Sequence, residues 1–467
     1  MTERTTGAMQ QVGLPQSPQM AGPRGEPALV LLYAEEFRSL RGALTLSGER
    51  TTIGREDTAN LKLEVPAVSR MHAEIVWDAS RWLVRDLGSR NGTLLDGHPI
   101  TQATLERGAE LRIGDAVFKF LDIDGAAYCP YLLDGGTLGG QRLVRDSELV
   151  GGYQMDRIAA ELLRIANTNL SVMLLGESGT GKEVAARELH RNSGRKGAFQ
   201  AVNCAAIPAT LLESELFGYK KGAFSGADRD KPGLVRLADQ GTLLLDEIGD
   251  MSPEAQAKLL RVLQSREVYP LGATAPEKVD IRVVCATHRD LQRLIQLEKF
   301  REDLYARLNE YQLRLPPLRD RKEDIFQLAR AFLRRHGRPE LKLSFGFVLG
   351  LVNYDWPYNV RELEGCIKRC LALCDGTTIE EALLPEPIQE LMADYGRPLS
   401  RSEHLMHSSS FEPSRASRGA APSDAELRAL LEKHRGNVAA VGRELGKARM
   451  QVHRWMERFG IDVADYR

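Results

Sequence analysis

The sequence predicts three folded domains of different classes: a β-sandwich, an α/β domain that ends in helices, and a small all-α domain. Short alternating runs of apolar and polar residues, separated by turn residues, recur between residues 28 and 123, as in a β-sandwich. From residue 146 on, consecutive apolar residues typical of buried strands are followed by segments of helical character. After residue 423 the pattern is helical throughout.

Length and composition limit what the chain can be. It has 467 residues, which is enough for about three domains of ordinary size. Because the net charge is −1, any contact with nucleic acid would have to come from a local basic patch. No apolar run is long enough to span a membrane, the N-terminus lacks the pattern of a signal peptide, and six cysteines in so long a chain do not form a disulfide framework. We therefore expect a cytoplasmic protein without membrane contact.

Shifts in composition give the expected domain boundaries. Residues 1–27 are rich in Gly, Pro, Gln and Ser, and residues 393–422 are rich in Ser, Arg, Pro and Gly. The expected order is a disordered tail at 1–27, the β-sandwich at 28–123, a linker at 124–145, the α/β domain at 146–392 with a helical lid from about residue 320, a flexible linker at 393–422, and the helical domain at 423–467.

Polar clusters separate the strands expected in the β-sandwich. The strands are expected at residues 28–33, 43–46, 61–65, 72–77, 82–86, 110–113 and 117–122. The clusters are Gly54-Arg55, Ser69-Arg70-Met71-His72 and Ser89-Arg90-Asn91-Gly92-Thr93. Loops with Arg, Ser and Asn at one end of a sandwich can hold an anion, because Arg offers a bidentate fork and Ser and Asn add hydrogen bonds. Taken singly, each cluster could equally be a structural turn.

Together, the segments IGR, VSRMHAEI and DLGSRNGTLLDG resemble a forkhead-associated (FHA) domain, a phosphothreonine reader. The resemblance implies a threonine-phosphorylated partner protein and a Ser/Thr protein kinase that modifies it. It also implies a structural role for His72. The residues that it places in the phosphopeptide site are Arg55, Ser69, Arg70, Arg90 and Asn91.

A glycine-rich loop follows the first apolar run of the α/β domain, residues 172–175. It reads Gly176-Glu177-Ser178-Gly179-Thr180-Gly181-Lys182-Glu183, and a helical segment comes next. When a strand, a glycine loop and a helix follow one another in this order, the backbone N–H groups of the loop can point at phosphate oxygens. The lysine then reaches the outer phosphates. The loop therefore predicts nucleotide binding. Glu183 stands where Ser or Thr normally offers a hydroxyl to magnesium.

A second apolar run, residues 241–245, ends in Asp246 and Glu247. At the end of a core strand beside a phosphate loop, one carboxylate can hold magnesium, and its neighbour can orient or deprotonate an attacking water. The alternative, a solvated loop after a strand, fits poorly with the apolar run directly before the pair, which ends in three leucines.

Between these runs lies a loop of small residues with one aromatic, Phe224. It is either an exposed contact surface or a loop whose Phe folds back onto the core, and composition does not separate the two. The segments GESGTGKE, ESELFGYKKGAFSGA and GTLLLDEIGD together resemble the AAA+ domain of bacterial enhancer-binding proteins, the activators of sigma-54 RNA polymerase. This implies that ATP and Mg²⁺ are the cofactors, that Asp246 serves magnesium and that Glu247 activates water. The loop implied to contact sigma-54 is Gly222, Ala223, Phe224, Ser225, Gly226 and Ala227, with Ser225 where the family usually has Thr.

The same resemblance implies further roles in the ATP site. Asn203 is expected to pair with Glu247, Thr287 and His288 to form sensor I, and Arg361 to reach the nucleotide from the lid. Arg301 and Arg307, which alone would be solvated salt-bridge partners, are implied to enter the neighbouring subunit's ATP site. A finger that acts in trans requires a ring, so we expect a hexamer.

Three cysteines in the lid, Cys366, Cys370 and Cys374, share one face of a helix. Three thiols on one face could bind a metal. Core packing is favoured, because free Cys behaves as a small hydrophobe and no His or Cys pair lies nearby in the sequence.

The last segment predicts a helix-turn-helix, with helices at residues 425–434, 437–445 and 449–459. Between Lys433 and Arg458 it carries seven basic and two acidic residues, a patch that could also be a solvated hairpin. It resembles the Fis-type DNA-binding domain that ends most enhancer-binding proteins, which implies binding to upstream enhancer DNA. Val452 and Trp455 are expected in its core. The residues expected to contact DNA are Arg449, Gln451, His453 and Arg454.

The sequence thus favours a transcription activator that binds a phosphothreonine and hydrolyses ATP to open a promoter. Two alternatives remain. One is a remodelling ATPase without a promoter role, which the GAFSGA loop beside a DNA-binding end disfavours. The other is a DNA-bound phosphopeptide scaffold with a merely regulatory ATPase, which the intact Lys182, Asp246, Glu247, Arg301 and Arg307 disfavour.

Overall fold

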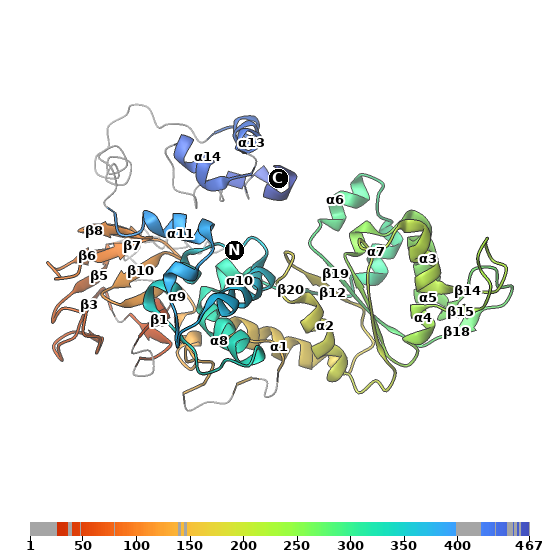
Figure 1. Cartoon of the computed structure of the whole chain (residues 1–467), viewed down its shortest axis with the longest axis horizontal. Coiled ribbons are helices and arrows are strands. Elements are labelled where there is room, and N and C mark those ends of the chain that lie inside the picture. The colour runs from red at the N-terminus through yellow and green to blue at the C-terminus, as the bar shows by residue number, and fades with distance from the viewer. Residues whose placement is uncertain are drawn as a thin grey trace, which may run out of the picture. The chain divides into compact units, whose positions relative to one another are not determined.

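The computed structural model describes residues 26–35, 40–46, 48–78, 80–138, 142–143, 147–397, 422–434, 436–445, 452, 455–456 and 459–466. The chain divides into two compact units, Met1–Arg397 and Pro398–Arg467. The first unit holds the β-rich, α/β and lid regions (Figure 1).

The N-terminal region is a β-sandwich of two sheets, as predicted. One sheet has the strand order β2-β1-β11-β10-β7-β8 and the other β4-β3-β5-β6-β9. The strands are β1 Ala28–Ala34, β2 Ala43–Thr45, β3 Arg50–Gly54, β4 Leu61–Lys62, β5 Ala73–Asp78, β6 Arg81–Asp86, β7 Thr93–Leu95, β8 His98–Ile100, β9 Gln102–Leu105, β10 Glu110–Ile113 and β11 Ala116–Leu121. The seven expected strands are present. The sequence missed β3, β7, β8 and β9, whose Thr, Arg, His, Pro and Gln residues interrupt any alternating apolar run.

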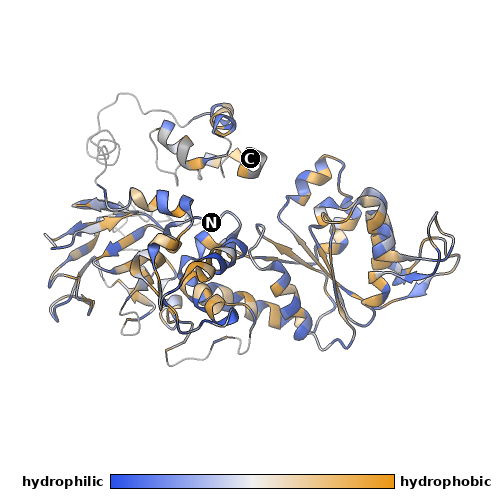
Figure 2. Ribbon diagram, viewed as in Figure 1, coloured by the Kyte–Doolittle hydropathy of each residue, from blue (hydrophilic) through white to orange (hydrophobic). Residues whose placement is uncertain are grey.

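The α/β region is built on a parallel sheet with the order β13-β16-β19-β12-β20. These strands are β12 Val172–Leu175, β13 Phe199–Asn203, β16 Thr242–Asp246, β19 Arg282–Thr287 and β20 Tyr311–Arg314. Helices cover the sheet, so β16 and β19 are buried along nearly their whole length and are mostly hydrophobic (Figure 2). The surrounding elements are α1 Tyr153–Ala166, α2 Lys182–Arg191, α3 Ala209–Phe217, α4 Leu234–Leu237, η3 Ile248–Asp250, α5 Pro253–Ser265, α6 Leu291–Gln296 and α7 Glu302–Leu308.

Two small hairpins leave this α/β region. Strand β14 (Gly218–Tyr219) pairs antiparallel with β15 (Lys231–Pro232), and β17 (Glu267–Val268) pairs antiparallel with β18 (Glu277–Lys278). A bridge between Tyr219 and Leu271 joins the two hairpins. The GAFSGA segment is the tip of the first hairpin.

A helical lid follows the sheet. Its elements are η4 Leu318–Asp320, η5 Lys322–Asp324, α8 Ile325–Arg335, β21 Lys342–Leu343, α9 Phe345–Asn353, α10 Asn359–Leu373, β22 Thr378–Ile379, η6 Glu381–Leu383 and α11 Glu386–Ala393. Cys366, Cys370 and Cys374 are buried in the lid's hydrophobic core, which confirms that this stripe packs the core.

The β-sandwich and the lid share one hydrophobic core. The ring of Tyr33 on β1 lies 5.1 Å from that of Phe326 on α8 and 5.9 Å from that of Phe345 on α9. Both helices lie beside β1 in Figure 1. The segment expected to be a linker also takes part, since it forms the 3-10 helix η2 (Gly125–Tyr128) and buries Leu133.

The second unit contains α13 (Asp424–Lys433), α14 (Val438–Leu445) and η7 (Val463–Tyr466). Ser423 and Glu426 form a capping box that starts α13. Val452 and Trp455 are buried with Leu427 and Leu431, as predicted. The four predicted DNA contacts Arg449, Gln451, His453 and Arg454 lie outside the described residues. Within the described ranges of both units, no helix has the length and apolar character needed to cross a bilayer.

Candidate functional site

The phosphate loop connects β12 to the first turn of α2, as the sequence predicts. Gly176, Gly179 and Gly181 all have positive φ, which turns the backbone sharply before Lys182 starts the helix. A Cβ on Gly179 would lie 2.2 Å from the carbonyl oxygen of Tyr358, so the lid approaches the loop too closely for a side chain. The loop therefore presents backbone N–H groups and a helix N-terminus on one side and the lid on the other.

Lys182 is buried within this loop. Its Nζ donates to the carbonyl oxygens of Gly176, at 2.9 Å, and Glu177, at 3.1 Å. Burial lowers the pKa of Lys182, and the charges of Glu247 and Asp246 oppose that shift. A cation this close to two carboxylates fits a site that gathers phosphate oxygens.

Asp246 and Glu247 lie where β16 ends, at the edge of the sheet that also carries the phosphate loop. Burial and the neighbouring Glu247 charge raise the pKa of Asp246. Glu247 has a φ of 51°, a left-handed conformation that is uncommon for a residue with a side chain. Its carboxylate lies 3.9 Å from Lys182 Nζ and 2.8 Å from His288 Nδ1.

The expected pairing of Asn203 with Glu247 is not what the structure shows. Asn203 Nδ2 donates to Asp246 Oδ2 at 3.3 Å, and its Oδ1 accepts from the backbone N–H groups of Ala205 and Ala206. Strand β13 pairs in register with β16, so Asn203 stands directly opposite Asp246 and one residue away from Glu247. The amide thus supports the predicted magnesium ligand, and Glu247 bonds to His288 on the other side.

The lid reaches the phosphate loop through several side chains. Arg361 Nη1 donates to Ser178 Oγ at 3.0 Å, so this predicted nucleotide contact lies beside the phosphate loop. Asn359 donates to the carboxylate of Glu177, at 3.1 Å, and to the carbonyl of Ser178, at 3.0 Å. The predicted sensor residue Thr287 is buried, and His288 is 41% exposed.

Sequence reasoning missed two arginines that hold the loop from the hinge between the α/β domain and the lid. Arg319 makes a bidentate ion pair with Glu177 at 2.6 and 2.8 Å. Arg321, which is buried, donates to the carbonyl of Thr180 at 3.0 Å. The dense charges of the segment LRDRKED after two prolines are a signal for such a role, although they do not reveal the partners.

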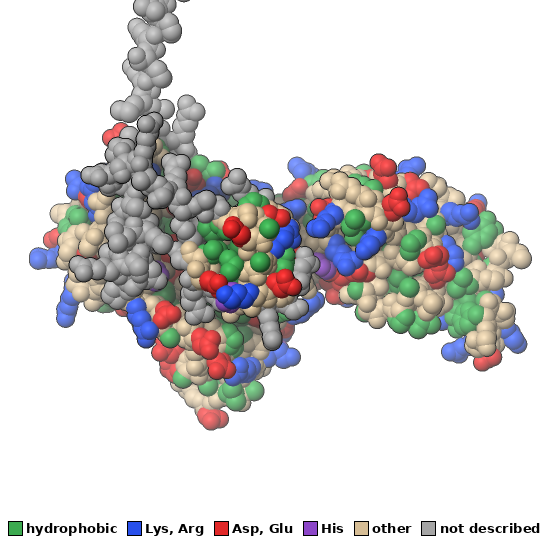
Figure 3. Space-filling view, turned by 90° about the horizontal axis from the view of Figure 1, so that it is seen from above, with side chains coloured by type: hydrophobic (Ala, Val, Ile, Leu, Met, Phe, Trp, Pro, Cys, Tyr) green, Lys and Arg blue, Asp and Glu red, His purple; other side chains and the backbone are tan. Residues whose placement is uncertain are grey.

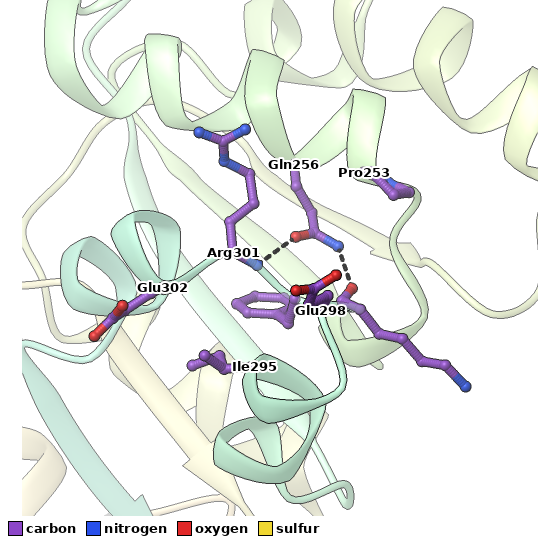
Figure 4. Close-up of a pocket in the computed structure, with 8 residues that line it drawn as sticks. Pro253, Gln256, Ile295, Glu298, Arg301 and Glu302 are labelled. Carbon is purple, nitrogen blue, oxygen red and sulfur yellow. Dashed lines mark hydrogen bonds between the residues drawn. The ribbon is translucent and has the colours of Figure 1, made fainter.

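The predicted arginine fingers sit at either end of α7. The backbone N–H of Arg301 donates to Gln256 Oε1 at 2.9 Å, beside a pocket that these two residues line together with Phe300. The guanidinium of Arg301 points away from that pocket (Figure 4) and pairs with Asp303 at 2.7 Å. Arg307, in the last turn of α7, is exposed. Neither guanidinium forms a bond with the phosphate loop of its own chain among the described contacts.

The GAFSGA loop is compact and presents its aromatic ring. Gly222 N donates to Ala227 O at 2.9 Å, and Gly222 and Gly226 have positive φ. Phe224 is 45% exposed and rests edge-on against Tyr219, with the ring centroids 4.9 Å apart. Of the two alternatives for this loop, the exposed surface is therefore the correct one, and Phe224 does not fold back onto the core.

The FHA loops come together at one end of the sandwich. Arg55 N donates to Ser69 O at 3.0 Å, Arg90 N donates to Ser69 Oγ at 3.0 Å, and Asn91 Nδ2 donates to Ala67 O at 2.7 Å. A Cβ on Gly54 would lie 2.0 Å from the carbonyl of Arg70, which explains the glycine beside Arg55. The side chains of Arg55, Arg70 and Arg90 are exposed beside this junction.

His72 holds two of these loops together. Its Nδ1 accepts from Ser69 N at 3.0 Å and its Nε2 lies 3.1 Å from Gly92 O, so the ring is a neutral Nε2–H tautomer. Burial lowers its pKa, which agrees with a neutral ring. This geometry fits the structural role expected for His72.

Three family models match the chain. The Sigma-54 interaction domain matches residues 150–314, the FHA domain residues 51–114, and the AAA+ ATPase lid domain residues 319–398. Among the relatives, Regulatory protein AtoC of Escherichia coli (strain K12) is 41% identical over 322 residues, 68% of this chain and 68% of AtoC. The chain belongs to the sigma-54-dependent transcriptional regulators.

Other relatives agree with this assignment. Nitric oxide reductase transcription regulator NorR1 of Cupriavidus necator is 36% identical to this regulator over 406 residues, 78% of this chain and 77% of NorR1. NtrX from Brucella abortus in complex with ATP has a TM-score of 0.50 and 31% identity, covering 67% of this chain and 70% of NtrX. The regulator is therefore an AAA+ ATPase, and it carries an FHA domain.

Proposed function

We propose that this sigma-54-dependent activator assembles as a hexameric ring and uses ATP hydrolysis to push its GAFSGA loops against sigma-54 RNA polymerase, which opens promoter DNA. The observation that carries the proposal is the exposed Phe224 at the tip of the β14–β15 hairpin. The hairpin begins directly after α3, which packs in the same hydrophobic core as β16, the strand that ends at Asp246. A movement of Glu247 could thus be transmitted to the GAFSGA loop through this core and α3. This account puts the protein in the cytoplasm, where the polymerase acts.

A ring is supported by the predicted fingers. Arg307 is exposed at the end of α7 and offers its charge to a neighbour, and Arg301 can do so if its exposed pair with Asp303 opens. An exposed ion pair of this kind contributes little stability, so an incoming γ-phosphate can replace Asp303 easily. In the ring, both arginines stabilise charge on the transferring phosphoryl group.

Magnesium fits the site through Asp246. Mg²⁺ is bound by one or two carboxylates together with substrate phosphates, so a single half-buried carboxylate beside the phosphate loop suffices. Burial and the charge of Glu247 raise the pKa of Asp246, and a bound cation would favour its ionised form. Glu183 pairs with Arg187 at 2.7 Å on the outer face of α2, which leaves Asp246 as the proposed protein ligand.

Phosphothreonine binding is proposed for the FHA loops, with Arg55, Ser69, Arg70, Arg90 and Asn91 around the phosphate. The observation that supports this phosphothreonine site is the junction of three loops, which Ser69 and His72 hold together. The partner would be a protein phosphorylated by a Ser/Thr kinase. Enhancer DNA is proposed for the C-terminal segment because it carries seven basic and two acidic residues between Lys433 and Arg458. On the face shown in Figure 3, the acidic and basic side chains of the described residues are interspersed.

Replacing Arg55 with alanine should weaken phosphopeptide binding about 10- to 100-fold, because a charge-assisted hydrogen bond contributes about 1.5–3 kcal/mol. The unphosphorylated peptide should bind equally weakly to both proteins, since it never used that contact. Calorimetry with matched phosphothreonine, phosphoserine and plain threonine peptides measures this. Equal affinity of the parent protein for phosphorylated and plain peptides would remove the phosphate-sensing role.

Binding to sigma-54 tests the proposed function. With an ATP transition-state mimic such as ADP–aluminium fluoride, the protein should form a stable complex with sigma-54 on gel filtration, and with ADP alone it should not. A remodelling ATPase without a promoter role, or a DNA-bound scaffold, would form no nucleotide-dependent complex. Lys182→Ala is the control, because it removes the lysine that reaches the phosphates.

A further inference from the structure

The carboxylate of Glu247 is held by His288, which directly follows the neighbouring strand β19. Glu247 Oε2 lies 2.8 Å from His288 Nδ1 and 3.4 Å from the backbone nitrogen of the same residue. An ionised carboxylate only accepts hydrogen bonds, so Nδ1 carries the proton in this pair. One residue therefore grips the carboxylate through both its side chain and its backbone.

His288 is itself presented by a fixed turn. On one side, Thr287 is buried at the end of β19, and its Oγ1 accepts from Arg289 N at 3.0 Å. On the other side, Arg289 pairs with Asp250 at 2.6 Å, and Asp290 caps the start of α6. The imidazole thus has little freedom to move away from Glu247.

We propose that His288 is the positioning residue for Glu247, in the role that family resemblance gives to Asn203. Its hydrogen bond fixes the direction of the Glu247 carboxylate, while Asn203 supports Asp246. His288 acts through Glu247 and not by binding nucleotide. Its loss should therefore lower the rate of hydrolysis and leave the affinity for ATP nearly intact.

His288→Ala in the full-length protein should lower kcat about 10- to 100-fold, the loss typical of a misplaced catalytic group. The KM for ATP should stay within about twofold of the parent. His288→Asn should recover most of the rate, because its amide can donate to the same carboxylate. Gln292→Ala, an exposed neighbour on α6, is the matched control and should behave as the parent. His288 is 41% exposed, so its truncation leaves the core untouched.

Three results would overturn this proposal. One is an unchanged kcat in His288→Ala. Another is a large rise in KM with an unchanged kcat, which would make His288 a nucleotide ligand. The third is an equal loss in His288→Asn and His288→Ala, which would mean that the donated hydrogen bond is not what matters.

A second, independent observation concerns the junction between the FHA domain and the ATPase. Lys119 on β11 of the FHA sheet is buried and forms an ion pair with Glu323 in η5, and it also donates to Asp320 O at 3.3 Å. Gln154 at the start of α1 donates to the other Glu323 oxygen at 2.9 Å. The two carboxylate oxygens of Glu323 therefore accept hydrogen bonds from two domains, one from the FHA domain and one from the ATPase domain.

The same hinge holds the phosphate loop. Arg319 and Arg321, which bracket Asp320, bind Glu177 and the carbonyl of Thr180. Asp324, next to Glu323, accepts from Gly152 N at 2.7 Å and lies 3.6 Å from Arg321. Residues 318–324 therefore contact the FHA domain through one set of side chains and the phosphate loop through another.

We infer that Lys119 is a positioning residue of the ATP site. By pairing with Glu323 it fixes residues 318–324, and through Arg321 it fixes the loop that binds phosphates. Breaking a buried ion pair by removing one partner leaves an uncompensated charge, and the segment then shifts to expose that charge. The expected consequence is weaker ATP binding from a change made outside the ATPase domain.

Lys119→Met should raise the KM for ATP about fivefold or more, the size of a modest coupling between sites. Adding Glu323→Gln should recover much of the loss, because the double variant no longer buries an unpaired charge. Lys62→Met is the matched control, since Lys62 is an FHA lysine whose ion pairs with Asp57 and Glu64 are exposed. Far-UV circular dichroism checks that each full-length variant is folded.

Two outcomes would contradict the role of Lys119. If Lys119→Met leaves KM and kcat within about twofold of the parent, the hinge does not depend on the FHA domain. If the double variant is as impaired as the single one, the loss comes from general destabilisation of the interface and not from the unpaired Glu323.

Discussion

Glu247→Gln should bind ATP like the parent and hydrolyse it at least about 100-fold more slowly, because general-base catalysis typically contributes 10²–10⁴-fold. The amide fills the same space and can still face His288, but it cannot accept a proton from water. Lys182 and Asp246 remain in place to hold the nucleotide. Single-turnover hydrolysis together with equilibrium binding of a fluorescent ATP analogue separates the two effects.

Lys182→Ala provides the comparison, since it should lose nucleotide binding itself. Hydrolysis by Glu247→Gln at close to the parental rate would show that another group activates the water. A joint loss of binding and hydrolysis would show instead that Glu247 contributes to holding the nucleotide.

Arg307→Ala should lower ATPase activity about 10³–10⁵-fold, the range measured for arginine fingers, while each subunit still binds ATP. The charge that it removes belongs to the neighbouring subunit's site. Mixed with Lys182→Ala subunits, the variant should regain activity at about one site in four, where an intact phosphate loop meets an intact finger.

Co-assembly of the two variants, checked by pull-down of differently tagged subunits, makes the mixing result decisive. A mixture that demonstrably co-assembles and stays inactive would exclude a finger in trans. Full activity of Arg307→Ala alone would leave Arg301 as the only candidate finger.

The parts of the site that could be predicted from sequence are those whose residues are contiguous. The phosphate loop and the Asp246–Glu247 pair each follow a buried strand, so one local pattern gives both the fold and the chemistry. The sequence could suggest that Phe224 is exposed but could not decide it, because the position of its side chain depends on Tyr219 and on a second hairpin.

Contacts between strands could not be predicted in the same way. The sequence expects Asn203 to meet Glu247, but the register of β13 and β16 sets it opposite Asp246. His288 takes the contact because β19 lies on the other side of β16. A difference of one residue in register decides which carboxylate each amide or imidazole reaches.

The junction between the FHA domain and the lid could not be predicted from the sequence either, for a related reason. Lys119 occupies one position of an otherwise apolar strand, where a lone lysine suggests an exposed edge. Its burial depends on Glu323, which is 204 residues away in the chain. Residues 124–145 look like a linker because their glycines obscure the few apolar side chains, Tyr128 and Leu133, that pack.

Phe224→Ala should separate ATP hydrolysis from its proposed transmission to sigma-54 through the GAFSGA loop. Promoter opening by sigma-54 RNA polymerase should be measured by permanganate footprinting, alongside ATPase activity of the same preparation. Leu237→Ala is the matched control, because Leu237 is 47% exposed and Phe224 is 45% exposed. We expect Phe224→Ala to hydrolyse ATP as the parent does and to open no promoter, while Leu237→Ala does both. Promoter opening by Phe224→Ala at the parental level would show that this loop does not transmit hydrolysis to sigma-54.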